Sequence, residues 1–460
     1  MPNGWSAVMA SGTERPAPAP AAHGAPRSGT RRAAWAGFIG TALEQYDFVI
    51  YGTASALVFS TLFFPNFSPV AGVIASFGAY AVGFAARPLG GLFFSRFGDR
   101  LGRKWVLVCT LLLMGISTMA IGLLPTYEQV GVLAPVLLVA CRFMQGFGAG
   151  AEQSGGATLL TETAPRGRRG RLASLVIAGA AAGTAAGAGV WALVQLLPQD
   201  QVLIWGWRLV FLSSLGVTVV ALLIRRRLNE SPVFQDLKRQ HIEPRKPVAE
   251  IFRNGRRPLL LVIFMTLGAG AQSYTYQVFM ASYLITAMSV DPAFVPPLLL
   301  VAAVCGGVAT VGFGILSDRI GRKPVYSAIL GAMVLIPGPS FIALHTGSPV
   351  AISVTIILGF VLAGFGSSGV QMSYYPELFG NRYRYAGVTL GREFAAVLGG
   401  GLAPLICAAL IGAFAGSWVP VAVYMSAMAA MSFVASRLAP ETRDRDLTTP
   451  IDATRAQVDR

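Results

Sequence analysis

Long apolar runs alternate with short polar connections along almost the whole chain. A helix needs about 20 mostly apolar residues to cross the hydrocarbon core of a bilayer. Runs of that length predict twelve transmembrane helices. The first six cover approximately residues 33–62, 71–94, 105–125, 132–160, 172–197 and 207–224, and the second six cover approximately 258–286, 295–316, 325–344, 350–375, 386–412 and 419–438.

Composition supports this interpretation and removes one alternative. Of the 460 residues, 54% are hydrophobic and 12% are charged, whereas soluble domains carry about 25% charged residues. A chain of this kind exposes most of its surface to lipid, which predicts an all-α polytopic membrane protein. The net charge of +15 lies in the connections and tails, so it reports membrane topology rather than nucleic-acid binding.

The positions of the basic residues predict the orientation. None of the 36 Lys and Arg residues falls in the short connections after spans 1, 3, 5, 7, 9 and 11. Because cytoplasmic loops are enriched in Lys and Arg, both termini are expected in the cytoplasm. Without a eukaryotic targeting signal, a bacterial inner membrane is the simplest location.

A short basic motif occurs twice, as Gly98-Asp-Arg-Leu-Gly-Arg-Lys104 and as Ser317-Asp-Arg-Ile-Gly-Arg-Lys323. Its two copies lie at matching places, which predicts two pseudo-symmetric six-helix bundles, as in many secondary transporters. The expected organisation is a disordered cytoplasmic tail (1–32), a first bundle (33–224), a basic cytoplasmic linker (225–257), a second bundle (258–438) and a cytoplasmic tail (439–460).

The motifs resemble those of the major facilitator superfamily. The repeated loop motif is joined by Arg142-Phe-Met-Gln145-Gly-Phe-Gly-Ala149 in span 4 and by Arg87-Pro-Leu-Gly-Gly91 in span 2. With Glu44-Gln-Tyr46-Asp47-Phe48 in span 1, these motifs look like the metabolite:proton symporter branch, which includes permeases for shikimate, α-ketoglutarate, citrate and proline/betaine. One departure is the pair Arg392-Glu393 in span 11, where uncharged residues are expected.

Carboxylates within the spans are candidate proton carriers. A charge in the bilayer interior costs at least about 2.5–3.5 kcal/mol, so such residues usually mark function or a paired structural site. Glu44 and Asp47 lie three residues apart on one helix face, and two neighbouring carboxylates cannot easily ionise together out of water. Glu152 in span 4 is a possible further site. The alternative for Asp47 is a permanent structural pair with an arginine.

Arginines within the spans are candidate anion-binding residues. The planar fork of Arg142 suits bidentate recognition of a substrate carboxylate, and the alternative is a structural partner for Glu44 or Asp47. Arg392 either faces the central cavity or extends to the cytoplasmic surface. Arg87, placed nearer the inner surface, is interpreted as structural.

Uncharged residues of four spans complete the candidate substrate site. They could hydrogen-bond a substrate, although aromatic residues at helical spacing more often serve packing. These residues are Tyr46, Gln145, Tyr274, Tyr276, Gln277, Gln371, Tyr374 and Tyr375.

The resemblance also implies that the repeated motif forms a gate between the halves. Its aspartates would cap or pair across the interface, with the basic residues among their partners. The expected gating residues are Asp99, Arg100, Arg103 and Lys104 in the first copy and Asp318, Arg319, Arg322 and Lys323 in the second. The alternative is a loop whose charge sets topology alone.

The sequence therefore predicts proton-coupled uptake of a small carboxylate-bearing metabolite by alternating access. The expected partners are an organic acid or zwitterion, protons and the lipid bilayer, without a cofactor, nucleic acid or metal, and the expected protein is a monomer and not an enzyme. A proton/drug antiporter and an uncoupled facilitator are the competing functions.

Overall fold

The computed structural model describes residues 27–101, 103–150, 161–162, 164–165, 167–226 and 247–454. Within these ranges, side chains are described except at residues 27–34, 36, 95–101, 103–105, 107, 221, 224–226 and 247–249. The described chain is mostly helical and contains no strand, which confirms the predicted all-α class.

The first half contains spans 1 to 6. Short π-helical turns (η) interrupt spans 1 and 6. In chain order its elements are α1 (Arg27–Ala54), η1 (Ser55–Phe59), α2 (Ser60–Phe63), α3 (Pro69–Leu101), α4 (Arg103–Leu123), α5 (Tyr127–Val130), α6 (Leu133–Ala149), α8 (Arg169–Val194), α9 (Gln199–Gln201), η2 (Val202–Gly206), α10 (Trp207–Leu212) and α11 (Ser214–Arg226).

The second half contains spans 7 to 12 and follows the short helix α13 (Pro247–Asn254). Its elements are α14 (Arg256–Tyr274), η3 (Thr275–Phe279), α15 (Met280–Thr286), α16 (Val295–Ile320), α17 (Arg322–Leu335), α18 (Pro337–Leu344), α19 (Pro349–Gly359), η4 (Phe360–Gly364), α20 (Gly366–Leu378), α21 (Arg384–Ala395), η5 (Ala396–Gly401), α22 (Ala403–Ala413) and α23 (Val419–Leu438).

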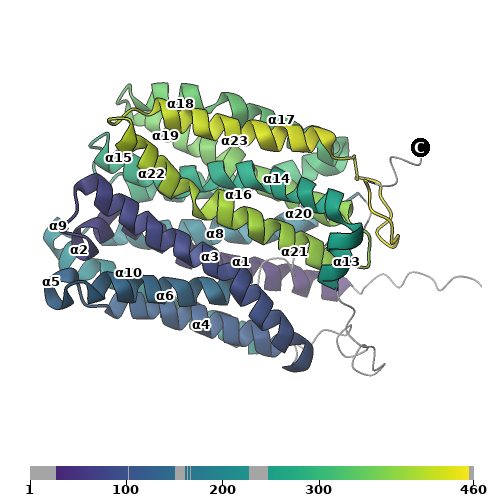
Figure 1. Cartoon of the computed structure of the whole chain (residues 1–460), viewed down its shortest axis with the longest axis horizontal. Coiled ribbons are helices and arrows are strands. Elements are labelled where there is room, and N and C mark those ends of the chain that lie inside the picture. The colour runs from purple at the N-terminus through teal and green to yellow at the C-terminus, as the bar shows by residue number, and fades with distance from the viewer. Residues whose placement is uncertain are drawn as a thin grey trace, which may run out of the picture.

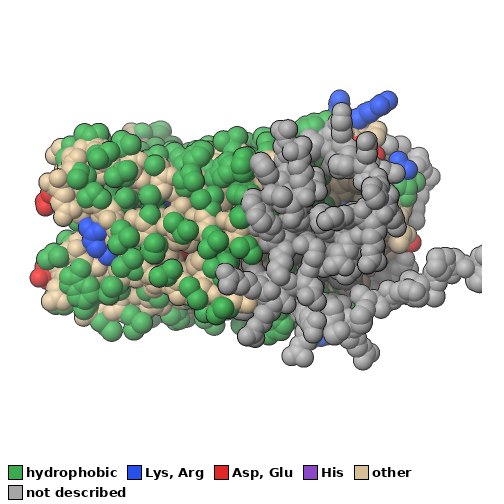
Figure 2. Space-filling view, turned by 90° about the horizontal axis from the view of Figure 1, so that it is seen from below, with side chains coloured by type: hydrophobic (Ala, Val, Ile, Leu, Met, Phe, Trp, Pro, Cys, Tyr) green, Lys and Arg blue, Asp and Glu red, His purple; other side chains and the backbone are tan. Residues whose placement is uncertain are grey.

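The lengths of these helices suit a membrane. Among the described residues, nine helices are long and apolar enough to span it, and α17 with α18, bent by 47°, forms a tenth. The shorter apolar segments Val108–Leu123 and Leu133–Ala149 stand at predicted spans 3 and 4. Hydrophobic side chains cover the flank of the bundle in Figure 2, and the charged side chains visible on that face gather toward its two ends.

Several helices are longer than the apolar runs predicted. The first helix begins at Arg27, within the segment expected to be a disordered tail, and α3 continues to Leu101, past the predicted end at residue 94. Similarly, α16 continues to Ile320, so Asp318 and Arg319 lie on its last turn rather than in a loop. Hydropathy detects only the apolar part of a helix, so polar turns at its ends are missed. The central residues 227–246 of the expected linker lie outside the described residues.

The two halves lie side by side, the first coloured purple to teal and the second teal-green to yellow in Figure 1. Helix α8 packs against α1 within its own half and against α16 of the other half. Glycines on α8 allow the approach to α1: a Cβ atom at Gly179 would lie 2.1 Å from the Phe38 carbonyl oxygen, and one at Gly183 would lie 2.0 Å from that of Ala42. The small-residue spacing in span 5 thus gives close helix packing.

Replacement Gly183→Ala is expected to destabilise the first half. Overpacking of a tight interface costs about 1–3 kcal/mol, so the thermal unfolding midpoint of the purified protein should fall. Gly78→Ala is the matched control, because a Cβ atom at Gly78 meets nothing within 4 Å. Equal unfolding midpoints for the two variants would contradict this packing.

Candidate functional site

A cavity of about 80 Å³ lies between the halves. Since about 10–15 Å³ on this measure holds one water molecule, the cavity has room for several. The π-helical turns η3, η4 and η5 each contribute to its wall, and such turns are frequent at functional sites. Its polar lining consists of Gln45 and Arg87 from the first half and Thr266, Ser273, Tyr274, Gln277, Ser368, Gln371, Arg392 and Glu393 from the second.

Arg87 joins carboxylates from both halves at this cavity. Its Nη1 donates to Glu44 Oε1 at 2.6 Å, while its Nε and Nη2 donate to Glu393 Oε2 and Oε1 at 3.0 and 3.2 Å. The side chains of Arg87, Glu44 and Glu393 are 3%, 1% and 9% exposed, respectively. This cluster, the Arg87 triad, is an ion-pair network that bridges the halves.

Arg87 lies on α3 within the apolar span Pro69–Phe94, whose end agrees with the predicted end of span 2. The partners of Arg87, however, are not predicted from sequence. Its partner Glu393 was not among the expected site residues. The signal in the sequence was the unexpected pair Arg392-Glu393 in span 11. The sequence could not show that Glu393 pairs with Arg87, which lies 306 positions away.

The second buried arginine, Arg142, is surrounded by aromatic rings. Its guanidinium carbon lies 4.1 Å from the ring centroid of Tyr51 and 4.7 Å from those of Phe48 and Tyr80. Cation–π contacts of this kind contribute about 0.5–2 kcal/mol each. Its Nη1 donates to Gln145, whereas its Nε and Nη2 have no hydrogen-bond partner among the described residues.

The two carboxylates on the shared face of span 1 have different partners. Glu44 binds Arg87, whereas Asp47 interacts with Thr118, Gln145 and Arg142. The ring of Phe48 lies between the two sites, 5.5 Å from the Arg87 guanidinium carbon and 4.7 Å from that of Arg142. One face of span 1 therefore contributes a carboxylate to each of two neighbouring polar clusters.

Three of the other expected substrate residues, Gln277, Gln371 and Arg392, line the cavity. Gln45 of the first half donates a hydrogen bond to Gln277 of the second at 3.3 Å.

Three expected tyrosines bond elsewhere, each within its own half. Tyr46 pairs with Ser213, Tyr276 with Ser340, and the Tyr374 hydroxyl donates to the Pro440 carbonyl. None of these tyrosines lines the cavity. Glu152 lies outside the described residues.

A second set of contacts joins the halves at the end that carries the second copy of the motif, called here the motif end. Asp318 on α16 accepts hydrogen bonds from the backbone N–H groups of Gly170 and Arg171, both at 2.8 Å. These groups belong to the first turn of α8, where a carboxylate is favourable. Arg322 donates to the same Asp318 carboxylate at 2.8 Å.

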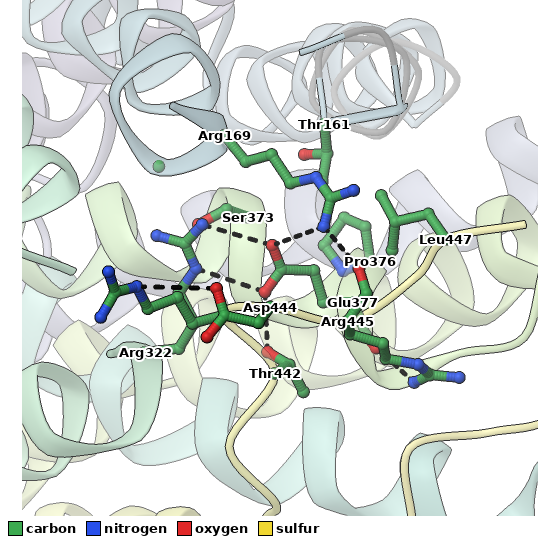
Figure 3. Close-up of polar contacts among 12 residues, drawn as sticks. Thr161, Arg169, Arg322, Ser373, Pro376, Glu377, Thr442, Asp444, Arg445 and Leu447 are labelled. Atoms are coloured by element: carbon green, nitrogen blue, oxygen red, sulfur yellow. Dashed lines mark hydrogen bonds and ion pairs between the residues drawn. The ribbon is translucent and has the colours of Figure 1, made fainter. Parts of the chain in front are cut away.

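Glu377, at the end of α20, extends this contact (Figure 3). Its carboxylate accepts hydrogen bonds from Arg322 Nε at 3.2 Å and from the Thr442 hydroxyl at 2.7 Å. Arg169 of the first half lies 3.9 Å from it. Glu377 was not expected as a site residue.

The C-terminal segment packs across the motif end rather than projecting freely. Arg169 donates to the Arg445 carbonyl at 2.8 Å, and Arg384 donates to the Leu447 carbonyl and to Glu162 of the first half. Burial, together with the nearby Arg384, lowers the pKa of Arg445 to about 10, so this guanidinium is still charged at neutral pH.

The halves also meet at the opposite end. A Cβ atom at Gly52 of α1 would lie 3.1 Å from Val278 of η3, and one at Gly412 of α22 would lie 3.0 Å from Val70 of α3. The halves are therefore in contact at both ends of the bundle as well as at the cavity.

Comparison with known proteins assigns the family. A model described as Major Facilitator Superfamily matches residues 37–404. The chain is 36% identical over 427 residues to the shikimate transporter of Escherichia coli (strain K12), covering 90% of this chain and 96% of that protein. The chain belongs to the major facilitator superfamily. It is also 31% identical over 441 residues to the proline/betaine transporter of the same strain, covering 91% and 85%.

A solved structure shares the superfamily fold. It is a partially occluded, inward-open conformation of the xylose transporter XylE from E. coli, with a TM-score of 0.68 and 17% identity over 91% of this chain and 100% of that one. The expected twelve-helix major facilitator fold is thus confirmed, and this superfamily member is a membrane transporter rather than an enzyme.

The two copies of the superfamily motif are described to different extents. In the second, Arg319 is exposed, and the Lys323 backbone N–H donates to Glu441 at 3.0 Å. In the first, the side chains of Asp99, Arg100, Arg103 and Lys104 lie outside the described residues.

Replacement Asp318→Asn is expected to favour opening at the motif end. Hydrogen bonds to a charged group contribute about 1.5–3 kcal/mol each, and 1.4 kcal/mol shifts an equilibrium about tenfold. Spin labels are placed at Arg171 and Ile320 in a variant without native cysteines. The population of molecules with a longer distance between the labels should grow by at least about tenfold relative to the protein with Asp318.

The matched control is Asp291→Asn, in the connection between α15 and α16 at the opposite end, whose carboxylate accepts only from the Ala293 N–H among the described residues. It should leave the distance distribution as in the unsubstituted protein. An unchanged distribution in Asp318→Asn would contradict a gating role for Asp318.

Proposed function

We propose that this chain is a proton-coupled symporter that takes up a small carboxylate-bearing metabolite by alternating access. The observation that carries the proposal is the pair of arginines, Arg87 and Arg392, in the wall of a cavity between the halves. Arginine presents a planar fork that matches a carboxylate. Shikimate, proline and betaine, the substrates in the relatives' names, all contain a carboxylate.

Arg392 is the better available of the two arginines. Its hydrogen bond among the described residues goes to the Met372 sulfur at 3.6 Å, which is a weak acceptor. Arg87, in contrast, already binds two carboxylates. An incoming anion could therefore make its first contact at Arg392 before any protein carboxylate is displaced.

Buried carboxylates would supply the proton coupling. Glu44, Asp47 and Glu393 lie at or beside the cavity, and each could carry a proton from one side of the membrane to the other. A monoanion moving with one proton is electrically neutral and uses only the pH gradient. A zwitterion with one proton also uses the membrane potential, about 2.3 kcal/mol per charge per 100 mV.

During alternating access, the contacts between the halves at the two ends would break in turn. In the proposed orientation the motif end, with both termini, faces the cytoplasm of a bacterium, because the basic residues gather there. Separation of Asp318 from the first turn of α8 would accompany opening to the inside. The pH gradient serves as the energy source, and the proposed protein acts as a monomer in the inner membrane.

Transport into vesicles containing the purified protein tests the proposal. With acid outside, we expect radiolabelled shikimate, proline or another carboxylate to accumulate above equilibrium, with alkalinisation of the external medium and loss of accumulation on adding a protonophore. Uptake that reaches only equilibrium and resists the protonophore would indicate an uncoupled facilitator. Expulsion of an apolar cation in exchange for protons would indicate an antiporter.

Replacement Arg392→Gln is expected to weaken carboxylate binding by about 10- to 100-fold, which corresponds to a charge-assisted hydrogen bond of about 1.5–3 kcal/mol. The affinity for the methyl ester of the same compound should change far less. Arg437→Gln, at the exposed end of α23, is the control. Equal losses for acid and ester on calorimetric titration of Arg392→Gln would contradict anion binding by Arg392.

A further inference from the structure

The contact between Arg87 and Glu393 has the geometry of a bound carboxylate ligand. Two nitrogens of the guanidinium donate to the two carboxylate oxygens, at 3.0 and 3.2 Å. A free carboxylate binds arginine in the same bidentate manner. Both residues line the cavity, so a carboxylate that entered it could form the same pair with Arg87.

The two carboxylates of the Arg87 triad are not equivalent. Glu44 comes from the same half as Arg87, so their 2.6 Å contact can persist when the halves move apart. Glu393 comes from α21 of the other half, and its contacts must lengthen or break in such a motion. Removing one partner of a buried pair is strongly destabilising, because the other charge is left uncompensated. A replacement carboxylate at Arg87 would offset that cost.

The charges allow this exchange only together with a proton. The ionisable groups that face Glu393 are Arg87 on α3, Glu44 on α1, Tyr274 on α14 and the adjacent Arg392. With Tyr274 neutral, the charges of the two arginines and the two glutamates cancel. One bound anion would leave an uncompensated negative charge, and one proton on Glu393 restores neutrality.

We propose that Glu393 is the carboxylate that couples proton and substrate transport in this protein. In the absence of substrate, Glu393 occupies the position at Arg87 that the substrate carboxylate takes when it binds. A proton from the external solution binds Glu393, Arg87 is released, and the substrate carboxylate binds Arg87 with Arg392 nearby. After the halves rock, the substrate leaves, Glu393 gives its proton to the cytoplasm and pairs with Arg87 again. This inference rests on the proposed function and names its exchanging residue.

Calorimetric titration tests the exchange in the unsubstituted protein. The probes are shikimate, 2-oxoglutarate, citrate, proline and glycine betaine, each titrated in two buffers of different ionisation enthalpy. We expect about one proton to be taken up per shikimate bound, with an affinity that falls by up to about tenfold per unit rise in pH. Shikimate binding without proton uptake and independent of pH would overturn the proposal.

Replacement Glu393→Gln keeps the shape of the side chain and removes its charge. We expect shikimate binding to persist with an affinity independent of pH and without proton uptake. In vesicles, exchange of preloaded substrate should continue, whereas the accumulation ratio should fall to about one from the tenfold that one pH unit supports through one proton. Glu393→Asp, which keeps the carboxylate, should retain accumulation.

The outcomes separate this inference from the proposed function. If the unsubstituted protein accumulates a carboxylate with protons and Glu393→Gln does so equally, Glu393 is not the coupling residue, although the proposed function stands. If the unsubstituted protein neither binds nor accumulates any of the five probes, the proposed function fails and the inference fails with it. If Glu393→Gln does not fold, the calorimetry of the unsubstituted protein and of Glu393→Asp still tests whether proton uptake accompanies binding.

Discussion

A single guanidinium held by carboxylates from both halves is the interaction on which this structure depends. Arg87, Glu44 and Glu393 are almost fully buried, and charges in such surroundings are tolerated only when paired and hydrogen-bonded. Breaking one side of the network therefore carries a large penalty. The halves of this superfamily member are thus linked at the cavity by a contact that only another charge, or a proton, can replace at low cost.

The second polar contact, at the motif end, depends on a different chemistry. Asp318 binds backbone N–H groups at the start of α8, and Glu377 binds arginines from both halves. The side chains of Arg322, Asp318 and Glu377 are 0%, 6% and 0% exposed, so this contact is as buried as the triad. Its acceptors at Asp318 are satisfied by backbone N–H groups as well as by an arginine, whereas the triad consists of charged side chains alone. The two together suit a transporter whose exit opens after its cargo has bound.

Sequence reasoning predicted the fold well because hydrophobic length and the repeated motif are local signals. It was weaker at the site, for two physical reasons. Hydropathy identifies a charged residue within a span but not its partner, so the contacts of Arg87 could not be predicted. Tyr274 and Tyr276 lie two positions apart, about 200° around a helix, so Tyr274 lines the cavity whereas Tyr276 packs away from it. Pairing of Arg87 with Glu393 needed the tertiary structure.

The most direct measurement is a cryo-electron microscopy structure of the protein in lipid with the carboxylate that it accumulates. The account predicts the ligand carboxylate at hydrogen-bonding distance, about 3 Å, from the Arg87 guanidinium, with Glu393 moved away and Glu44 still in place. A ligand bound elsewhere while the pair of Arg87 and Glu393 stays intact would contradict it.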